Sequence, residues 1–185
     1  MRKIALLTVA YALVCLACNN QPESETTDQI IEKVTANSPG INKGAGTYEI
    51  SAPRGWEKKD TSIGGVKITF LFEPVVAGAR FRTNINVVTE SMGEDSWDTY
   101  YKKNMSTIRQ YTQDFKELGE GQEDINGLKA RWFKYSHTQS GVAIDAMIYA
   151  LTKDNIAYVI TCTAQGGKLE AYKPQLAEAL QSFKF

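Results

Sequence analysis

Histidine and cysteine are scarce in this sequence of 185 residues, which contains one histidine and three cysteines. Cys15 and Cys18 lie near the N-terminus, so Cys162 is the only cysteine left for a folded domain. That count excludes a disulfide framework or a cysteine metal cluster in the domain. His137 is the only histidine that could act as a general base. We therefore expect neither a metal nor another cofactor.

An excess of charge and a long apolar run are also missing. The 21 basic residues balance the 21 acidic ones, so nothing in the charge attracts nucleic acid. Residues 4–16 form a short apolar run, whereas a membrane-spanning helix needs roughly 20 apolar residues. This run has the length of a signal sequence and not of a membrane span.

The N-terminus resembles a bacterial lipoprotein signal. Arg2 and Lys3 precede the apolar run, and Cys15-Leu16-Ala17-Cys18 resembles the lipobox, in which the final cysteine receives lipid. We expect Cys18 to carry the membrane anchor, with palmitate among its acyl chains. An ordinary secretory signal cleaved near Ala17 is the alternative, because Cys15 stands where lipoboxes usually carry leucine.

The segment after Cys18 has the composition of a flexible tether. Residues 19–46 are rich in polar residues and glycine and have few large apolar residues, so they cannot bury a core. A chain of this length holds a domain on the order of 30 Å from the bilayer. Asn19 is not the aspartate that retains lipoproteins at the inner membrane in enteric bacteria, which favours the outer membrane. The expected organisation is a signal at 1–17, the lipidated cysteine and tether at 18–46, and one domain at 47–185.

Alternating apolar and polar residues predict seven candidate strand segments in that domain, which we expect to form a central sheet of about six strands. Short connections such as Gln139-Ser140-Gly141 and Lys153-Asp154-Asn155 join the last three strands into a meander. The predicted strands are residues 48–51, 66–72, 84–87, 115–124, 128–138, 142–152 and 156–164.

Two helices complete the predicted fold. Residues 96–111 carry apolar side chains at three- and four-residue intervals, and a second helix begins near Lys173 after a lead-in at 168–172. Pro174 is compatible with the first turn of that helix. Both faces of the strands at 142–152 and 156–164 are apolar, so helices must cover both faces of the sheet. The expected fold class is α+β, an α/β/α sandwich on a central antiparallel sheet.

The order of several short motifs resembles a known family, the PsbP-like and DcrB-like proteins of the periplasm and thylakoid lumen, often lipoproteins in bacteria. The resemblance covers residues 48–185. It implies the same sandwich fold and a generally non-enzymatic role in assembling or stabilising larger complexes, and it brings no catalytic motif. The motifs are Ala52-Pro53-Arg54-Gly55-Trp56, Ser96-Trp97-Asp98-Thr99-Tyr100, Ile125-Asn126-Gly127-Leu128-Lys129-Ala130, Tyr158-Val159-Ile160-Thr161-Cys162-Thr163-Ala164 and Ser182-Phe183-Lys184.

His137 and Asp145 are the two candidates for a catalytic or otherwise functional side chain in the predicted strands. Ser136, next to His137, points to the opposite face of its strand, and no Gly-x-Ser-x-Gly elbow is present. His137 is therefore expected to be a surface or strand-end residue. Asp145 interrupts an apolar strand, and we expect a lysine or arginine on a neighbouring strand to pair with it. The acidic residues within 117–124 do not match a calcium-binding loop and predict a solvated strand.

These observations favour a lipid-anchored, non-catalytic envelope protein that binds or stabilises a protein partner. We expect the exposed contact surface at Arg80, Phe81 and Arg82, in the connection before the third strand, because loops often carry function. A carrier of a small apolar ligand is the alternative, and an envelope hydrolase that uses His137 is the second alternative. The carrier would need a cavity lined by Trp97, Tyr101, Met147 and Tyr149.

Overall fold

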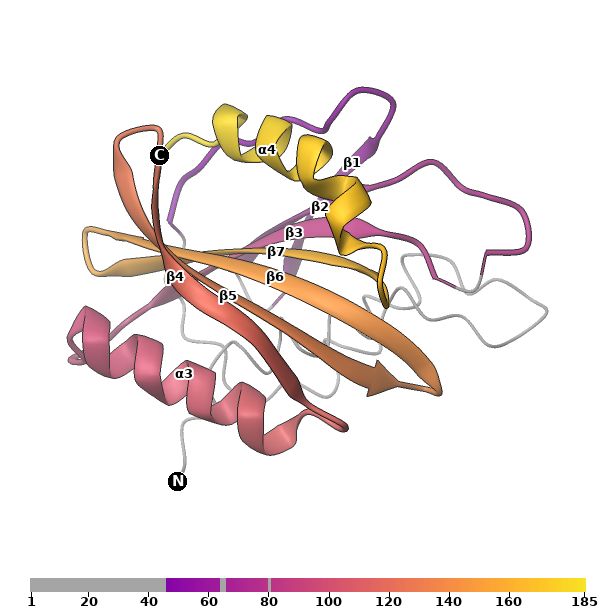
Figure 1. Cartoon of the computed structure of the whole chain (residues 1–185). Helices are drawn as coiled ribbons and strands as arrows, with labels where there is room; N and C mark the ends of the chain where they lie inside the picture. The colour runs from indigo at the N-terminus through magenta and orange to yellow at the C-terminus, as the bar shows by residue number, and fades with distance from the viewer. Residues whose placement is uncertain (1–45, 64–65, 80) are drawn as a thin grey trace.

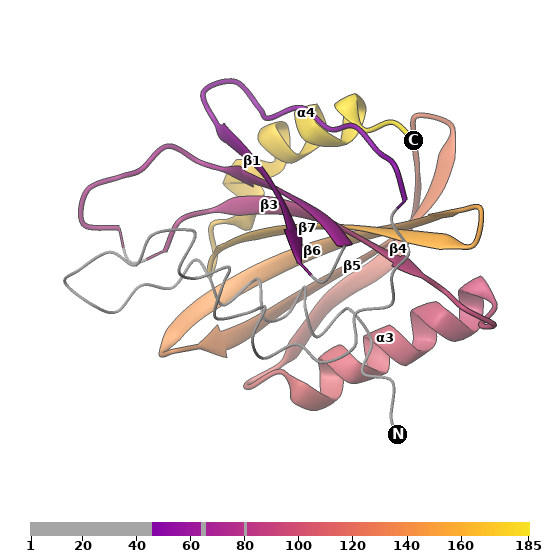
Figure 2. The same ribbon diagram turned by 180° about the vertical axis from the view of Figure 1, so that it is seen from behind.

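The computed structural model describes residues 46–63, 66–79 and 81–185, and it contains a sheet between two helices (Figure 1). Seen from behind, the sheet again lies between α4 and α3 (Figure 2). The elements are β1 (Glu57–Ile63), β2 (Val66–Phe72), β3 (Asn84–Ser91), α3 (Trp97–Tyr111), β4 (Lys116–Ile125), β5 (Leu128–Gln139), β6 (Val142–Lys153), β7 (Ile156–Gln165), the short 3₁₀ helix η2 (Leu169–Tyr172) and α4 (Lys173–Ser182).

The sheet is antiparallel throughout, with the strand order β1-β2-β3-β7-β6-β5-β4. The run from β4 to β7 is a meander. Each of its hairpins turns through two residues, and both residues in the first turn, Asn126 and Gly127, have positive φ. Positive φ at both central residues is the signature of a type I′ turn, whose twist matches that of the flanking strands. The chain therefore has local reasons to form this half of the sheet.

Each face of the sheet has its own apolar core. On the face that α4 covers, Leu176 and Leu180 pack with Ile160 and Leu151 in a large buried cluster. On the opposite face, Met105 and Ile108 of α3 pack against a separate cluster that comprises Phe133, Tyr135, Ala146, Ile148 and Val159. Successive residues of a strand point to opposite faces, which is why β6 contributes Leu151 to one cluster and Ile148 to the other. The α/β/α sandwich predicted from the two-sided apolar strands is confirmed.

The structure departs from the sequence prediction at the start of the domain. Among the described residues the sheet has seven strands where about six were expected, and it includes β1, which was not predicted. The strand predicted at 48–51 is absent from the described sheet, since only Glu49 forms a bridge, with Lys184. The other predicted strands and both helices lie close to the expected positions.

Some of the sequence predictions lie outside the described residues. These are the signal at residues 1–17, Cys18, the tether up to residue 45, and Arg80. None of the described helices combines the length and apolarity that a membrane crossing requires.

Candidate functional site

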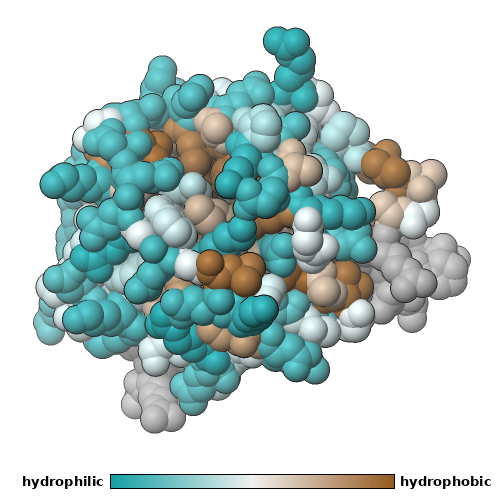
Figure 3. Space-filling view, in the orientation of Figure 1, coloured by the Kyte–Doolittle hydropathy of each residue, from teal (hydrophilic) through white to brown (hydrophobic). Residues whose placement is uncertain are grey.

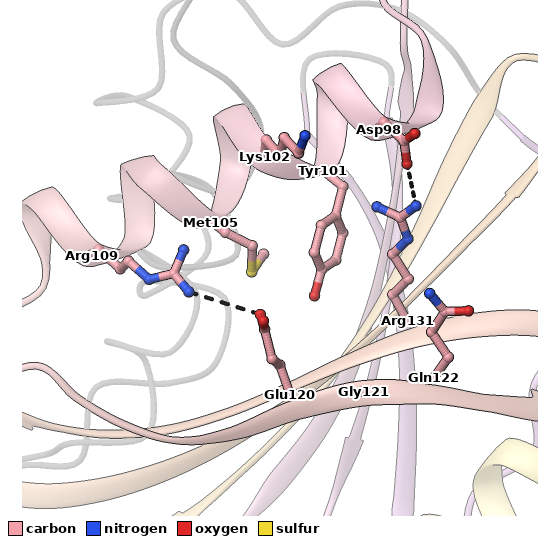
Figure 4. Close-up of a pocket in the computed structure, with 9 residues that line it drawn as sticks. All are labelled: Asp98, Tyr101, Lys102, Met105, Arg109, Glu120, Gly121, Gln122 and Arg131. Carbon is pink, nitrogen blue, oxygen red and sulfur yellow. Dashed lines mark hydrogen bonds and ion pairs between the residues drawn. The ribbon is translucent and has the colours of Figure 1, made fainter.

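A recess lies between α3 and the edge of the sheet, and we call it the α3 recess (Figure 4). Its volume of about 630 Å³ falls within the range of ligand and side-chain pockets. Charged side chains dominate its walls, and Tyr101 and Met105 point into it from the helix. The α3 recess is lined by Asp98, Tyr101, Lys102, Met105, Arg109, Glu120, Gly121, Gln122 and Arg131.

Ion pairs hold the two arginines of the α3 recess in place. Arg131 of β5 pairs with Asp98 in the first turn of α3, and its guanidinium lies 4.9 Å from the centre of the Tyr101 ring. Arg109, in the last turn of α3, pairs with Glu117 at 2.8 Å and lies 3.9 Å from Glu120. Burial and the nearby Glu120 raise the pKa of the Tyr101 phenol, so its hydroxyl stays protonated and can donate a hydrogen bond.

A second recess lies on the opposite face of the same edge, beneath α4, and we call it the α4 recess. Its volume is about 570 Å³, and its walls are mainly apolar. Charged residues occupy its rim, where Glu170 accepts hydrogen bonds from Lys134 at 2.5 Å and Lys173 at 2.6 Å. These bonds lower the pKa of Glu170 to about 2. The α4 recess is lined by Leu118, Glu123, Trp132, Lys134, Met147, Tyr149, Leu169, Glu170, Lys173, Leu176, Ala177 and Leu180.

Two glycines of β4 make room for the indole that forms one wall of the α4 recess. A Cβ atom at Gly121 would lie 2.7 Å from Cζ2 of Trp132, and one at Gly119 would lie 3.4 Å from Cζ3. The register of β4 against β5 also shifts between Glu117 and Gly119. Such a bulge bends an edge strand locally. The ring of Trp132 therefore lies flat over β4 because the strand has no side chain at Gly121.

The four residues predicted to line one ligand cavity do not lie together. Met147 and Tyr149 face α4 and line the α4 recess. Tyr101 lines the α3 recess, and Trp97 stacks on Tyr100 and contacts Tyr101 beside it. The single cavity expected for a carrier is therefore wrong, because the sheet separates the two pairs.

His137 is buried and not at the surface. Its side chain is 2 % exposed and its ring contacts Tyr135, so the expected surface position is wrong. Burial lowers the pKa of the imidazole. Ser136 and Asp145 lie in register on β5 and β6, and strand alternation directs both away from the face that holds His137. The arrangement expected for a hydrolase is not present among these residues.

Asp145 has a structural partner of a different kind from the one predicted. Its carboxylate accepts a hydrogen bond from the backbone N–H of Gly167 at 2.8 Å, in the turn that follows β7. No lysine or arginine of the described chain pairs with it. A backbone N–H therefore stabilises the Asp145 carboxylate. This hydrogen bond also fixes the turn that leads into η2.

The predicted contact surface around Arg80 is only partly available. Phe81 is 6 % exposed and packs against Ile144, so its expected exposure is wrong. Arg82 donates to the backbone oxygen of Glu73 at 2.7 Å and pairs with Glu57 at 2.9 Å. The exposed apolar residues of this connection are Val75 and Val76, and Figure 3 shows apolar surface at its protruding tip.

The acidic residues of β4 do not form a metal site. Among the described residues, no group of three or more histidine, cysteine, aspartate or glutamate side chains could hold a metal ion. β4 is largely exposed, as the sequence predicted for a solvated strand. Its carboxylates separate onto both faces, because Glu120 lines the α3 recess and Glu123 lines the α4 recess.

A buried polar row crosses the middle of the sheet. Asn86 of β3 pairs with Thr161 of β7, and Asn84 pairs with Thr163. All four side chains are at most 2 % exposed. The hydroxyls of Thr161 and Thr163 and the carboxamide of Asn86 make no hydrogen bond within the described chain. Buried polar atoms without partners lower stability, so this row is a local weakness of the core.

Several solved structures have a fold similar to that of this chain. A protein of unknown function from Pseudomonas aeruginosa aligns with a TM-score of 0.55 at 14 % identity over 68 % of this chain and 94 % of that one. LpqN, involved in cell envelope biogenesis of Mycobacterium tuberculosis, aligns with a TM-score of 0.58 at 11 % identity over 80 % of this chain and 86 % of that one. Cyanobacterial PsbP from Synechocystis aligns with a TM-score of 0.50 at 14 % identity over 80 % of this chain and 95 % of that one.

These alignments confirm the PsbP-like fold that the motifs predicted, whereas a DcrB-like relation stays a prediction. No family model and no curated protein matches the sequence. Sequence reasoning missed both recesses. The one signal that could have indicated them is the pair of glycines at 119 and 121 in a predicted strand, opposite a strand that carries Trp132.

Proposed function

We propose that this PsbP-like domain is a non-catalytic binding module of the bacterial cell envelope, anchored to a membrane, with the outer membrane favoured, through lipid on Cys18. Its role is to bind or stabilise a protein partner. The similarity to LpqN, a protein of cell envelope biogenesis, supports the envelope setting. The lipobox-like sequence before Cys18 supports the anchor.

Partner binding is supported by one observation: two recesses and two exposed apolar or aromatic side chains lie together at one edge of the sheet. The α3 recess and the α4 recess open on either side of β4. Tyr111 at the end of α3 is 59 % exposed, and Leu118 in β4 is 42 % exposed. Large apolar and aromatic side chains beside charged ones are typical of the core and rim of protein interfaces. A buried His137 and the absence of a metal group among the described residues give no comparable support to catalysis.

Site-specific photo-cross-linking in living cells tests this proposal. A photoreactive residue replaces Lys102, which lines the α3 recess, or Gln110, an exposed residue of the same helix that does not line it. We expect one covalent adduct with an envelope protein from position 102 and little from position 110. Equal labelling of many proteins from both positions would contradict a specific partner at this edge.

The anchor needs its own measurement. Cys18→Ala removes the lipid acceptor, and we expect the variant to leave the membrane fraction while wild type stays in it. A Cys18→Ala protein that sediments with membranes as wild type does would refute lipidation at this residue. The two measurements are independent, because one reports the membrane attachment and the other the partner.

The α4 recess favours a second candidate function, the carriage of a small apolar ligand. Trp132, Met147 and Leu176 give it apolar walls, and its volume of about 570 Å³ suits a small molecule. Native mass spectrometry of the protein purified from its own cells tests this function. A bound species lost on Leu176→Trp, which fills the recess, would favour the carrier, whereas the unliganded mass alone would count against it.

A further inference from the structure

The edge formed by β4 is open to another strand. β4 is the last strand in the sheet order, and among the described strands it pairs only with β5. A strand with one neighbour presents a row of free N–H and C=O groups along its outer side. We propose that an extended segment of the protein partner adds to the sheet along β4, and that its alternate side chains enter the α3 recess and the α4 recess. This inference rests on the proposed function, because it assumes a protein partner.

The hairpin between β4 and β5 determines which backbone groups face outward. Its type I′ turn at Asn126 and Gly127 makes Ile125 and Leu128 a hydrogen-bonded pair. Hydrogen-bonded and non-hydrogen-bonded pairs alternate along an antiparallel ladder. Counting back from the turn, the N–H and C=O groups of Asp124, Gln122 and Glu120 point away from β5. These residues provide the main-chain partners for an added strand.

The two recesses give the added strand its side-chain pattern. Glu120 and Gln122 line the α3 recess, whereas Leu118 and Glu123 line the α4 recess. Because successive side chains of a strand point to opposite faces, every second side chain of the partner faces charged walls and the others face apolar walls. Main-chain bonds supply affinity and pockets for alternate side chains supply specificity when a strand is added in this way.

The charge of β4 indicates what the polar side chains of the partner are. β4 has four carboxylates, at Glu117, Glu120, Glu123 and Asp124, and one cation, Lys116. Two of the three cations that line the α3 recess, Arg109 and Arg131, are already paired with Glu117 and Asp98. Glu120 is 57 % exposed at its side chain and lies 3.9 Å from Arg109, which is closer to Glu117. A lysine or arginine opposite Glu120 on the added strand would pair with it, as opposite charges across strands are favourable. The segment that fits therefore alternates basic and apolar residues.

The same charge disfavours a second copy of this chain at the edge. Two β4 strands side by side would bring the carboxylates of one close to those of the other, and like charges facing each other across strands are destabilising. The register shift at Glu117 and Gly119 further interrupts regular self-pairing, as bulges at sheet edges commonly do. The strand that adds to β4 therefore comes from a different protein, and the segment that forms it is basic.

A proline at Gln122 tests the main-chain bonds directly. Proline is tolerated in an edge strand where the N–H faces solvent, so Gln122→Pro should fold while it blocks strand addition. Gln122→Ala is the matched control, because it removes the same side chain and keeps the N–H. Both are made in the full lipoprotein with a photoreactive residue in place of Leu118. We expect Gln122→Pro to lower the adduct yield roughly tenfold relative to Gln122→Ala, as the loss of a main-chain hydrogen bond can do.

The outcomes separate this inference from the proposed function. An adduct equally strong in Gln122→Pro and Gln122→Ala would refute strand addition and leave partner binding intact. No adduct from any position, in the wild-type background, would refute partner binding and the inference together. Should Gln122→Pro fail to fold, Glu120→Lys keeps the backbone and reverses the charge. We expect Glu120→Lys to reduce the adduct yield. An undiminished yield would refute the inference that a basic segment of the partner lies along β4.

Discussion

Replacing Gly121 with alanine should test how β4 and Trp132 fit together. The new Cβ would lie 2.7 Å from Cζ2 of the indole, so Trp132 or the strand must shift. Overpacking of this kind costs about 1–3 kcal/mol. Exchanging glycine for alanine also restricts the unfolded chain, which stabilises the protein by about 0.4–1 kcal/mol. The net expectation is a free energy of unfolding lower by about 1–2 kcal/mol.

A second substitution, at Trp132, should reverse the sign of the effect that Gly121→Ala has on the free energy of unfolding. In a Trp132→Ala background the indole is gone, so Gly121→Ala meets no clash and should raise the free energy of unfolding by about 0.5 kcal/mol. The four proteins form a double-mutant cycle, measured by urea unfolding and followed by far-UV circular dichroism so that the loss of a tryptophan does not disturb the signal. A coupling energy near zero, with Gly121→Ala equally destabilising in both backgrounds, would refute the contact as the reason for glycine.

Two further predictions concern buried polar groups. Thr161→Val removes a buried hydroxyl that has no partner within the described chain, so it should raise the free energy of unfolding by about 1 kcal/mol. Thr69→Val is its control and should lower stability, because Thr69 donates to Asp60 at 2.5 Å and accepts from Tyr48 at 2.9 Å; a stabilised Thr69→Val would contradict the argument. Burial lowers the pKa of His137 below its ordinary 6.5, so the unfolded chain binds a proton first and stability should fall as the pH drops below about 6.5. Unfolding measured across that range should show a shallower decline in His137→Gln, and an unchanged decline would show that other groups cause it.

The central strands could be predicted from sequence because their pattern is local. β5, β6 and β7 alternate or are apolar on both faces, and each turn between them has residues suited to positive φ. β1 could not be predicted in this way. Its sequence, Glu-Lys-Lys-Asp-Thr-Ser-Ile, has a single apolar residue, and it is a strand because β2 offers it a partner. The segment around Tyr48 is the opposite case. Its residues alternate between apolar and polar, yet its only pairing within the described chain is the single bridge between Glu49 and Lys184.

The candidate site was harder to predict because it depends on which helix covers which face. The alternation in β6 separates Met147 and Tyr149 from Ile148, but it does not state that α3 lies over Ile148. That assignment follows from the order of the strands, with α3 crossing from the centre of the sheet to its edge at β4. Sequence patterns alone therefore group Trp97 and Tyr101 with Met147 and Tyr149, which lie on the other side of the sheet.

The pairing of the two ends of the domain determines the order in which it can fold. β4 to β7 pair with their neighbours in sequence, so they close short loops at little entropic cost. β3 must instead wait for β7, and Glu49 pairs with Lys184 while Tyr48 stacks on Phe183. Phe183, 1 % exposed, completes the core only after the preceding strands of the domain are available. A chain that leaves the ribosome or crosses a membrane N-terminus first would thus keep this domain incompletely folded until Phe183 and Lys184 emerge.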